Sequence, residues 1–168
     1  LPYPGGPEIG RLAAIARTNN LPPFAPLPRP MLHSGDLDFS FSGLKTAVRY
    51  AVADKTLSED EKMSLARDFE DAVVDVLVHK SIKAIKEHLV QSFILGGGVS
   101  ANTYLRKAIS ALSAPQSFPS LKVYLPDTTL STDNSIMIAL AGHARLTEAL
   151  TASDFTATIR ANGNQTLA

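Results

Sequence analysis

Two clusters of small polar residues, each directly after an apolar run, are the parts of this chain best suited to chemistry. Gly96–Gly98, with Asn102 close behind, follows the apolar run at 92–95. Ser131–Ser135 follows a second apolar run at 121–125. Glycines let the backbone approach a ligand closely, and helix N-termini favour negative charge. Together the two clusters indicate half of a cleft that handles a nucleotide.

Asn102 and Asp133 are the two side chains whose roles remain open from residue type alone. The Asn102 amide can donate to and accept from a nucleoside, but Asn is also a good helix N-cap. The Asp133 carboxylate, kept ionised by a helix dipole, would suit a hard metal ion, but Asp too is a common N-cap. Residue type and position leave the two interpretations of Asn102 balanced and favour the cap for Asp133.

Other reactive side chains give weaker signals. The chain has four histidines with no metal-binding spacing, and we expect them on the surface: His33, His79, His88 and His143. It contains no H-E-x-x-H motif, so a zinc peptidase is not supported. Ser40, Ser42 and Lys45 suggest a nucleophile, but no general base lies nearby in the sequence.

Two consecutive strand–turn–helix units would position the polar clusters. The apolar runs predict strands at 92–95 and 121–125, followed by helices at 101–112 and 134–150. In an open α/β sheet, ligands bind beyond the carboxyl ends of the strands, where such turns collect. The sequence therefore predicts the α/β fold class.

The upstream residues predict mostly helix. Pro7 to Thr18 reads as a short helix, because a proline in the first turn costs little. Asp38–Ser42 alternates polar and apolar residues and predicts a half-buried strand, with a helix after it. Ser58 and Glu61 form a capping-box pattern that predicts a long helix to about Leu89.

The composition indicates an ordinary globular protein. The chain has 168 residues, of which 45% are hydrophobic and 19% charged, with sixteen basic residues against sixteen acidic ones. This length suffices for one domain, in which we expect an entry and helical part at 1–90, an α/β part at 91–150 and a tail at 151–168. Without cysteine, a signal peptide or an apolar run long enough to span a bilayer, the cytoplasm is the simplest compartment.

Six motifs in order carry a resemblance to a known family. They are Tyr3–Pro7, Pro28–Met31, Asp38–Thr46, Phe69–Leu77, Gly97–Asn102 and Thr132–Asn134. The series resembles the C-terminal half of the TsaD family, the tRNA N6-adenosine threonylcarbamoyltransferases formerly called O-sialoglycoprotein endopeptidases. It covers residues 1 to about 149. Gly10, where archaeal and eukaryotic members usually carry Glu, favours a bacterial-type protein.

The resemblance implies a fold and an activity. The family has the actin/Hsp70/sugar-kinase (ASKHA) fold, in which two RNase H-like lobes close over a nucleotide, and this chain would be the C-terminal lobe with helical additions. Its members are acyltransferases that move a threonylcarbamoyl group from threonylcarbamoyl-AMP to N6 of the adenosine 3′ to the anticodon, in tRNAs reading codons that start with A.

The resemblance also implies site residues. It makes Gly6 and Asn102 contacts of the adenylate, and it places the backbone of Gly97 and Gly98 against the adenosine. It makes Asp133 a ligand of one divalent metal ion, iron or zinc, which overrides the cap-only interpretation. The implied partners are tRNA and the TsaB- and TsaE-type proteins.

One part of the family pattern is missing from this chain. The other metal ligands of the family come from an H-x-x-x-H motif in the N-terminal lobe, and the sequence has no such motif. A single carboxylate does not hold a catalytic metal, which takes about three protein ligands. We therefore expect the chain to be a fragment that is inactive alone.

Two other functions compete with this one. A noncatalytic partner-type scaffold of the same fold would need neither Asp133 nor Asn102. A small-molecule kinase of the same superfold would use the glycine turn for ATP but would lack the motif at Asp38–Thr46. A metallopeptidase comes last, for want of any motif.

Overall fold

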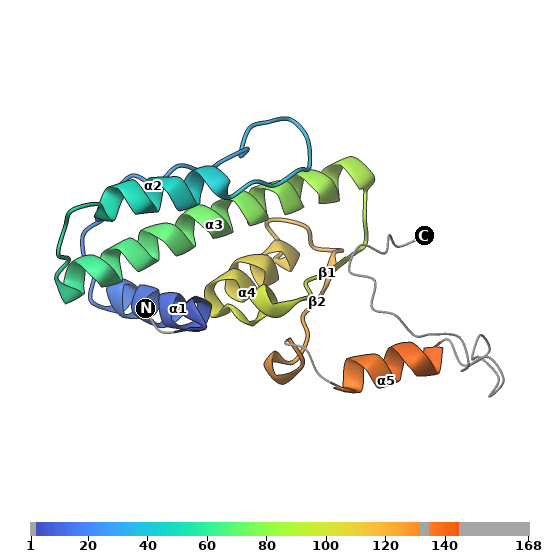
Figure 1. Ribbon diagram of the computed structural model, residues 1–168. Coiled ribbons are helices and arrows are strands. Elements are labelled where there is room, and N and C mark those ends of the chain that lie inside the picture. The colour runs from blue at the N-terminus through green and yellow to red at the C-terminus, as the bar shows by residue number, and fades with distance from the viewer. Residues whose placement is uncertain (1–2, 132–134, 145–168) are drawn as a thin grey trace, which may run out of the picture. The chain divides into compact units, whose positions relative to one another are not determined.

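The structure is a computed structural model that describes residues 3–131 and 135–144. The chain divides into two compact units after residue 132, and each is described by itself. The described residues are mostly helical and contain one small parallel sheet. Figure 1 shows the elements in chain order.

Helices α1 (Gly5–Thr18) and α3 (Glu59–His88) pack side by side (Figure 1). The predicted first helix is confirmed and begins two residues earlier than expected. The capping box of α3 is also confirmed, because Ser58 Oγ accepts from the Glu61 N–H at 3.2 Å and Glu61 Oε2 accepts from the Ser58 N–H at 2.8 Å. Local capping signals therefore set the start of α3 correctly.

The predicted strand at Asp38–Ser42 is wrong. The structure gives residues 38–41 no strand pairing, and helix α2 (Ser42–Val52) begins at the last of the five residues. Phe41 packs against a core cluster that contains Leu27 and Leu44, whereas Phe39 is 49% exposed. The alternation therefore reflects one partly buried and one exposed phenylalanine, because the described residues offer this segment no partner strand.

The sheet consists of strands β1 (Ser92–Ile94) and β2 (Lys122–Tyr124), paired in parallel with Phe93 opposite Val123. Both strands are confirmed, each shorter than predicted. The chain between them forms the 3-10 turn η1 (Gly98–Ala101), helix α4 (Thr103–Ser110) and the 3-10 turn η2 (Ala111–Ser113). One face of the sheet packs against α4 and α3 around a buried cluster that contains Leu105 and Ile109.

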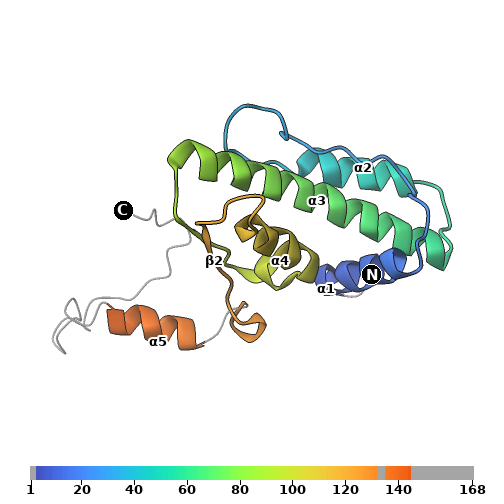
Figure 2. The same ribbon diagram turned by 180° about the vertical axis from the view of Figure 1, so that it is seen from behind.

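Helix α3 connects the two hydrophobic clusters of the first unit. Its Leu65 and Ala72 belong to the cluster shared with α2, and its Val74 and Ile85 belong to the cluster shared with α4 and the sheet. Figure 2, from behind, again shows α3 between α2 and α4. A helix that packs on several sides buries a wider band of residues than a single apolar stripe.

The second unit contributes helix α5 (Ser135–Ala144) to the described residues. This helix lies within the helix predicted at 134–150. A short 3-10 turn, η3 (Thr128–Leu130), ends near the close of the first unit. Among the described helices, none is both long enough and apolar enough to span a bilayer.

Candidate functional site

The first polar cluster forms an open turn at the carboxyl end of β1. Gly97 has φ +79° and ψ 172°, a backbone conformation that essentially only glycine adopts. A Cβ placed on Gly96 or Gly97 would meet no heavy atom within 4 Å. The turn is therefore accessible backbone, which is what the close approach of a ligand requires.

The turns that follow β1 and β2 lie against each other. The Ser100 hydroxyl donates to Ser131 Oγ at 3.1 Å, and both residues are buried. Arg106 of α4 donates to the Ser100 carbonyl oxygen at 3.0 Å and to the Pro126 carbonyl oxygen at 2.8 Å. Because the strands are parallel, both turns sit at the same end of the sheet, as the sequence predicted.

Asn102 is the N-cap of α4. Its Oδ1 accepts a hydrogen bond from the Leu105 N–H at 2.8 Å, so the capping interpretation is confirmed. Its Nδ2 donates to Oε1 of Glu70 on α3 at 2.6 Å. Among the described residues, the second hydrogen on Nδ2 has no partner. Asn102 can therefore cap the helix and still donate to a ligand.

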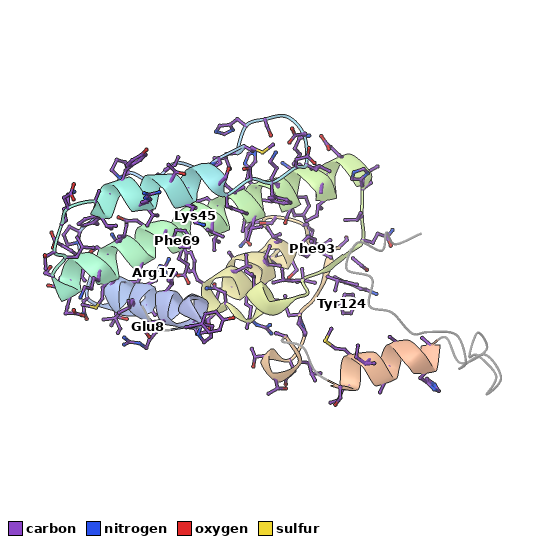
Figure 3. The ribbon with its side chains drawn as sticks, viewed as in Figure 1. Glu8, Arg17, Lys45, Phe69, Phe93 and Tyr124 are labelled. Atoms are coloured by element: carbon purple, nitrogen blue, oxygen red, sulfur yellow. The ribbon has the colours of Figure 1, made fainter. Side chains whose placement is uncertain are left out.

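A set of polar side chains ties Asn102 to two other helices. Glu70 is only 5% exposed, and its Oε2 pairs with Arg17 of α1. Arg17 pairs through its other terminal nitrogen with Asp71, and its guanidinium carbon lies 3.6 Å from the centroid of the Tyr104 ring on α4. Figure 3 marks Arg17 between α1 and α3. We name these five residues, Arg17, Glu70, Asp71, Asn102 and Tyr104, the interhelical network.

The interhelical network carries fixed charges. Burial opposes the charge on Arg17, but the hydrogen bonds to Glu70 and Asp71 outweigh it and raise the Arg17 pKa above its ordinary value. Burial raises the pKa of the Tyr104 phenol above 10.0, and the Asp71 carboxylate raises it further. At neutral pH the network therefore contains a charged guanidinium stacked on a neutral phenol ring.

Gly6 lies in the first turn of α1, on the helix that approaches Asn102. A Cβ placed on Gly10 would lie 3.5 Å from both Asn102 Nδ2 and Glu70 Oε1. Gly6 is four residues earlier, about 6 Å along the helix axis at 1.5 Å per residue. Figures 1 and 2 both show the deep-blue end of α1 beside α4. The structure thus places the start of α1, which contains Gly6, beside α4, whose N-cap is Asn102 and which the glycine turn precedes.

Comparison with known proteins assigns the family. A family model described as TsaD, tRNA N6-adenosine threonylcarbamoyltransferase, matches residues 1–140. The chain belongs to the TsaD family. The family implies an ASKHA-type fold, to which the described residues contribute mostly helix and the small parallel sheet.

Curated relatives support this TsaD assignment. Proteins of Burkholderia ambifaria, Burkholderia cenocepacia and Burkholderia vietnamiensis are each 51% identical to the chain over 153 residues. Each is called tRNA N6-adenosine threonylcarbamoyltransferase. The alignments cover 87% of this chain and 42% of each relative, so the chain spans less than half the length of these TsaD proteins.

The described part of this TsaD chain does not form a metal site. It contains no group of three His, Cys, Asp or Glu side chains that could hold a metal ion. Asp133, the predicted ligand, lies outside the described residues. His33, His79 and His88 are exposed as expected, although the rings of His33 and His79 meet edge to face at 5.6 Å. We therefore derive no chemical step through a metal.

An open pocket of about 640 Å³ adjoins the interhelical network. Its walls include Arg17, Pro23, Phe24, Ala25, Pro26, Arg29, Arg67, Asp68, Asp71 and Tyr104. All three of its arginines form ion pairs, Arg29 with Asp75 and Arg67 with Asp68 in addition to Arg17. Arg17 is not a solvated surface charge, because its ion pairs with Glu70 and Asp71 bridge α1 and α3.

Sequence reasoning missed Glu70 and Tyr104. A signal for Glu70 was present, because it lies three residues before the apolar Val73 on α3. Residues with this spacing share a helix face, so a carboxylate there requires a buried partner. Tyr104 gave no comparable signal, because its guanidinium partner comes from a helix distant in the sequence.

Proposed function

We propose that the protein transfers a threonylcarbamoyl group from threonylcarbamoyl-AMP to N6 of the adenosine 3′ to the anticodon, in tRNAs reading codons that start with A. Family membership and the names of the 51% identical relatives support this acyltransferase activity. In this proposal the chain supplies the C-terminal, RNase H-like lobe of a longer TsaD protein. That lobe would act in the cytoplasm.

One observation carries the proposal to particular residues. The N-terminal turn of α1, which contains Gly6, lies beside α4, and Asn102 caps α4 directly after the open turn at Gly97 and Gly98; this arrangement supports the proposal. A helix N-terminus and an accessible backbone favour a phosphate, and a free amide hydrogen suits a nucleoside acceptor. We assign these four residues to the adenylate.

The chemistry needs orientation more than strong bases. The adenosine N6 attacks the carbonyl carbon of the mixed anhydride, forming the N–C bond, and the bond from that carbon to the phosphate oxygen breaks. AMP leaves with the electron pair, and the attacking nitrogen loses a proton. Because the adenosine amine is a poor nucleophile, holding donor and acceptor in place must supply much of the rate.

The proposal also includes a metal ion and partner proteins, which involve residues outside the described part of the chain. Asp133 is proposed as a ligand of one divalent ion, iron or zinc, with co-ligands from outside this chain. When bound, such an ion would neutralise charge on the leaving phosphate. TsaB- and TsaE-type proteins are proposed to assemble with the protein, and tRNA is its proposed substrate.

The test is threonylcarbamoyl transfer by the native gene product with its partner proteins. The assay supplies threonylcarbamoyl-AMP and tRNA, and mass spectrometry of the nucleosides detects the modified adenosine. Asn102→Ala is expected to lower the rate about tenfold or more, the effect of one hydrogen bond to a charged ligand. Asp133→Ala is expected to abolish transfer. Ser113→Ala, at an exposed turn, is the control and should transfer normally.

Three outcomes would contradict the proposal. The first is a wild-type protein that leaves tRNA unmodified although its partners are active. The second is phosphoryl transfer from ATP to a small molecule, which would point to a kinase. The third is full activity in Asn102→Ala and Asp133→Ala, which would point to a scaffold.

A further inference from the structure

We infer that Glu70 is a positioning residue, which orients the Asn102 amide so that its second hydrogen points to the adenylate. This inference rests on the proposed function, since it takes Asn102 as an adenylate contact. Glu70 itself is buried at 5% exposure and acts through Asn102. Nothing in the family resemblance assigns Glu70 a role.

The two hydrogen bonds of Asn102 fix which way its amide faces. The Leu105 N–H is a donor and so requires the amide oxygen, whereas the Glu70 carboxylate accepts and so requires the amide nitrogen. A flipped amide would lose both bonds and place its oxygen against a carboxylate. The cap alone would leave the nitrogen without a fixed partner, so Glu70 supplies the second constraint.

Burying the Glu70 carboxylate costs free energy unless a nearby positive charge compensates its own charge. Arg17 provides that compensation, because it pairs with Oε2 of Glu70 while Oε1 remains for Asn102. Arg17 is itself held by Asp71 and stacked on Tyr104. Both oxygens of the Glu70 carboxylate are therefore engaged and its direction is fixed, so that Oε1 is held in place to accept from Asn102.

Gly10 completes the arrangement by leaving space beside the amide. A Cβ at this position would already lie 3.5 Å from Asn102 Nδ2 and from Glu70 Oε1, which is ordinary contact. A longer side chain would have to extend into the space next to the pair. Gly10 thus keeps the neighbourhood of the amide free on the side of α1.

A double-mutant cycle on the native gene product tests the inference, with AMP as the probe and isothermal titration calorimetry as the measurement. Asn102→Ala and Glu70→Ala are each expected to weaken AMP binding about tenfold. Because Glu70 acts through Asn102, the double variant should bind AMP no more weakly than Asn102→Ala alone. Independent, additive losses would overturn the inference, as would wild-type AMP affinity in either single variant.

A matched control separates positioning from general destabilisation. Asp75 lies on α3, as Glu70 does, and forms an ion pair with Arg29. Asp75→Ala breaks this ion pair and leaves the hydrogen bonds of Asn102 in place, so AMP affinity should be unchanged. A loss like that of Glu70→Ala would overturn the inference. Thermal unfolding reports whether each variant folds. If Glu70→Ala does not fold, the same cycle with Glu70→Gln, which keeps the side-chain shape, is judged by the same criterion.

The transfer assay distinguishes failure of the inference from failure of the proposed function. Threonylcarbamoyl transfer by the wild type together with additive AMP losses would remove only the role of Glu70. Coupled AMP losses in a protein that leaves tRNA unmodified would remove the proposed reaction and keep the positioning role. A wild type that does not bind AMP would overturn both.

Discussion

Gly96 and Gly97 are neighbours in the same open turn, yet they differ in one property of the backbone. Neither would bring a Cβ within 4 Å of another heavy atom, but Gly97 has φ +79°. Steric crowding is therefore equal at the two positions, and only the backbone conformation separates them. Comparing the two positions therefore tests whether the positive φ is what requires glycine at position 97.

Gly97→Ala is expected to cost about 1–3 kcal/mol of unfolding free energy, because an L-residue is strained in this conformation. Gly96→Ala is the matched control and should cost less than about 1 kcal/mol. Denaturant unfolding of the native gene product measures both. Equal losses in the two variants would contradict the argument from backbone conformation.

Asn102 shows how one residue can satisfy two interpretations. Its oxygen caps α4, its nitrogen binds Glu70, and one amide hydrogen is without a partner among the described residues. A cap and a ligand contact therefore do not exclude each other, because they use different atoms of the amide. The residue type left capping and ligand binding as alternatives, but the structure allows Asn102 to do both.

Among the elements, the segment 31–37 is held to α3 by one buried lysine. Lys80 is 2% exposed, and its Nζ donates to Ser34 Oγ at 2.7 Å and to the backbone oxygen and Oδ1 of Asp36 at 2.8 and 2.9 Å. The hydrogen bond from Ser34, followed by that from Lys80, lowers the pKa of Asp36 from 3.8 to about 2. All three ammonium hydrogens thus have acceptors in this segment.

The lowered pKa of Asp36 gives stability a defined pH dependence. A depressed carboxyl pKa stabilises the folded state above the unfolded value of 3.8, and the contribution is lost as the pH falls through about 2. Asp36→Asn should therefore lower the melting temperature, and the full difference from wild type should be seen above about pH 5. This difference should disappear as the pH falls from about 4 to about 2.

Thermal melts across this pH range check the prediction. In a Lys80→Met background the effect of Asp36→Asn should shrink at every pH, because one of the two main partners is gone. A difference that stays constant from about pH 6 down to about pH 2.5 would show that Asp36 stabilises the fold by other means.

At the scale of the whole molecule, the sheet is incomplete by the standards of parallel sheets. In the described residues it has two strands, and Ile94 and Tyr124, which lie opposite each other, are 75% and 53% exposed. Parallel sheets are normally covered on both faces, and a lone pair of strands is marginal. Together with the 42% coverage of the relatives, this supports the proposal of a longer TsaD protein.

Residues 1–168 alone are therefore expected to transfer no threonylcarbamoyl group to tRNA, whereas the native gene product is expected to transfer it under the proposed function. The physical reason is that one proposed carboxylate ligand, Asp133, does not hold a catalytic metal. The transfer assay compares the two proteins, with circular dichroism as the control for helix content. Robust transfer by residues 1–168 would contradict the prediction.

The sequence by itself determined the elements whose signals are local. Pro7, the Ser58–Glu61 capping box and the apolar runs at 92–95 and 121–125 each predicted an element that the structure contains. The order of the motifs predicted the family. These signals act over a few residues, so they do not depend on how distant segments pack.

Only the tertiary structure decided the contacts between distant segments. Glu70 meets Asn102 across 32 positions and Arg17 across 53, and no local pattern encodes either pair. The error at Asp38–Ser42 has the same origin, because a strand requires a partner that an alternating sequence does not reveal. Helix packing brings the interhelical network together, so the sequence could single out Asn102 but not its hydrogen bond to Glu70.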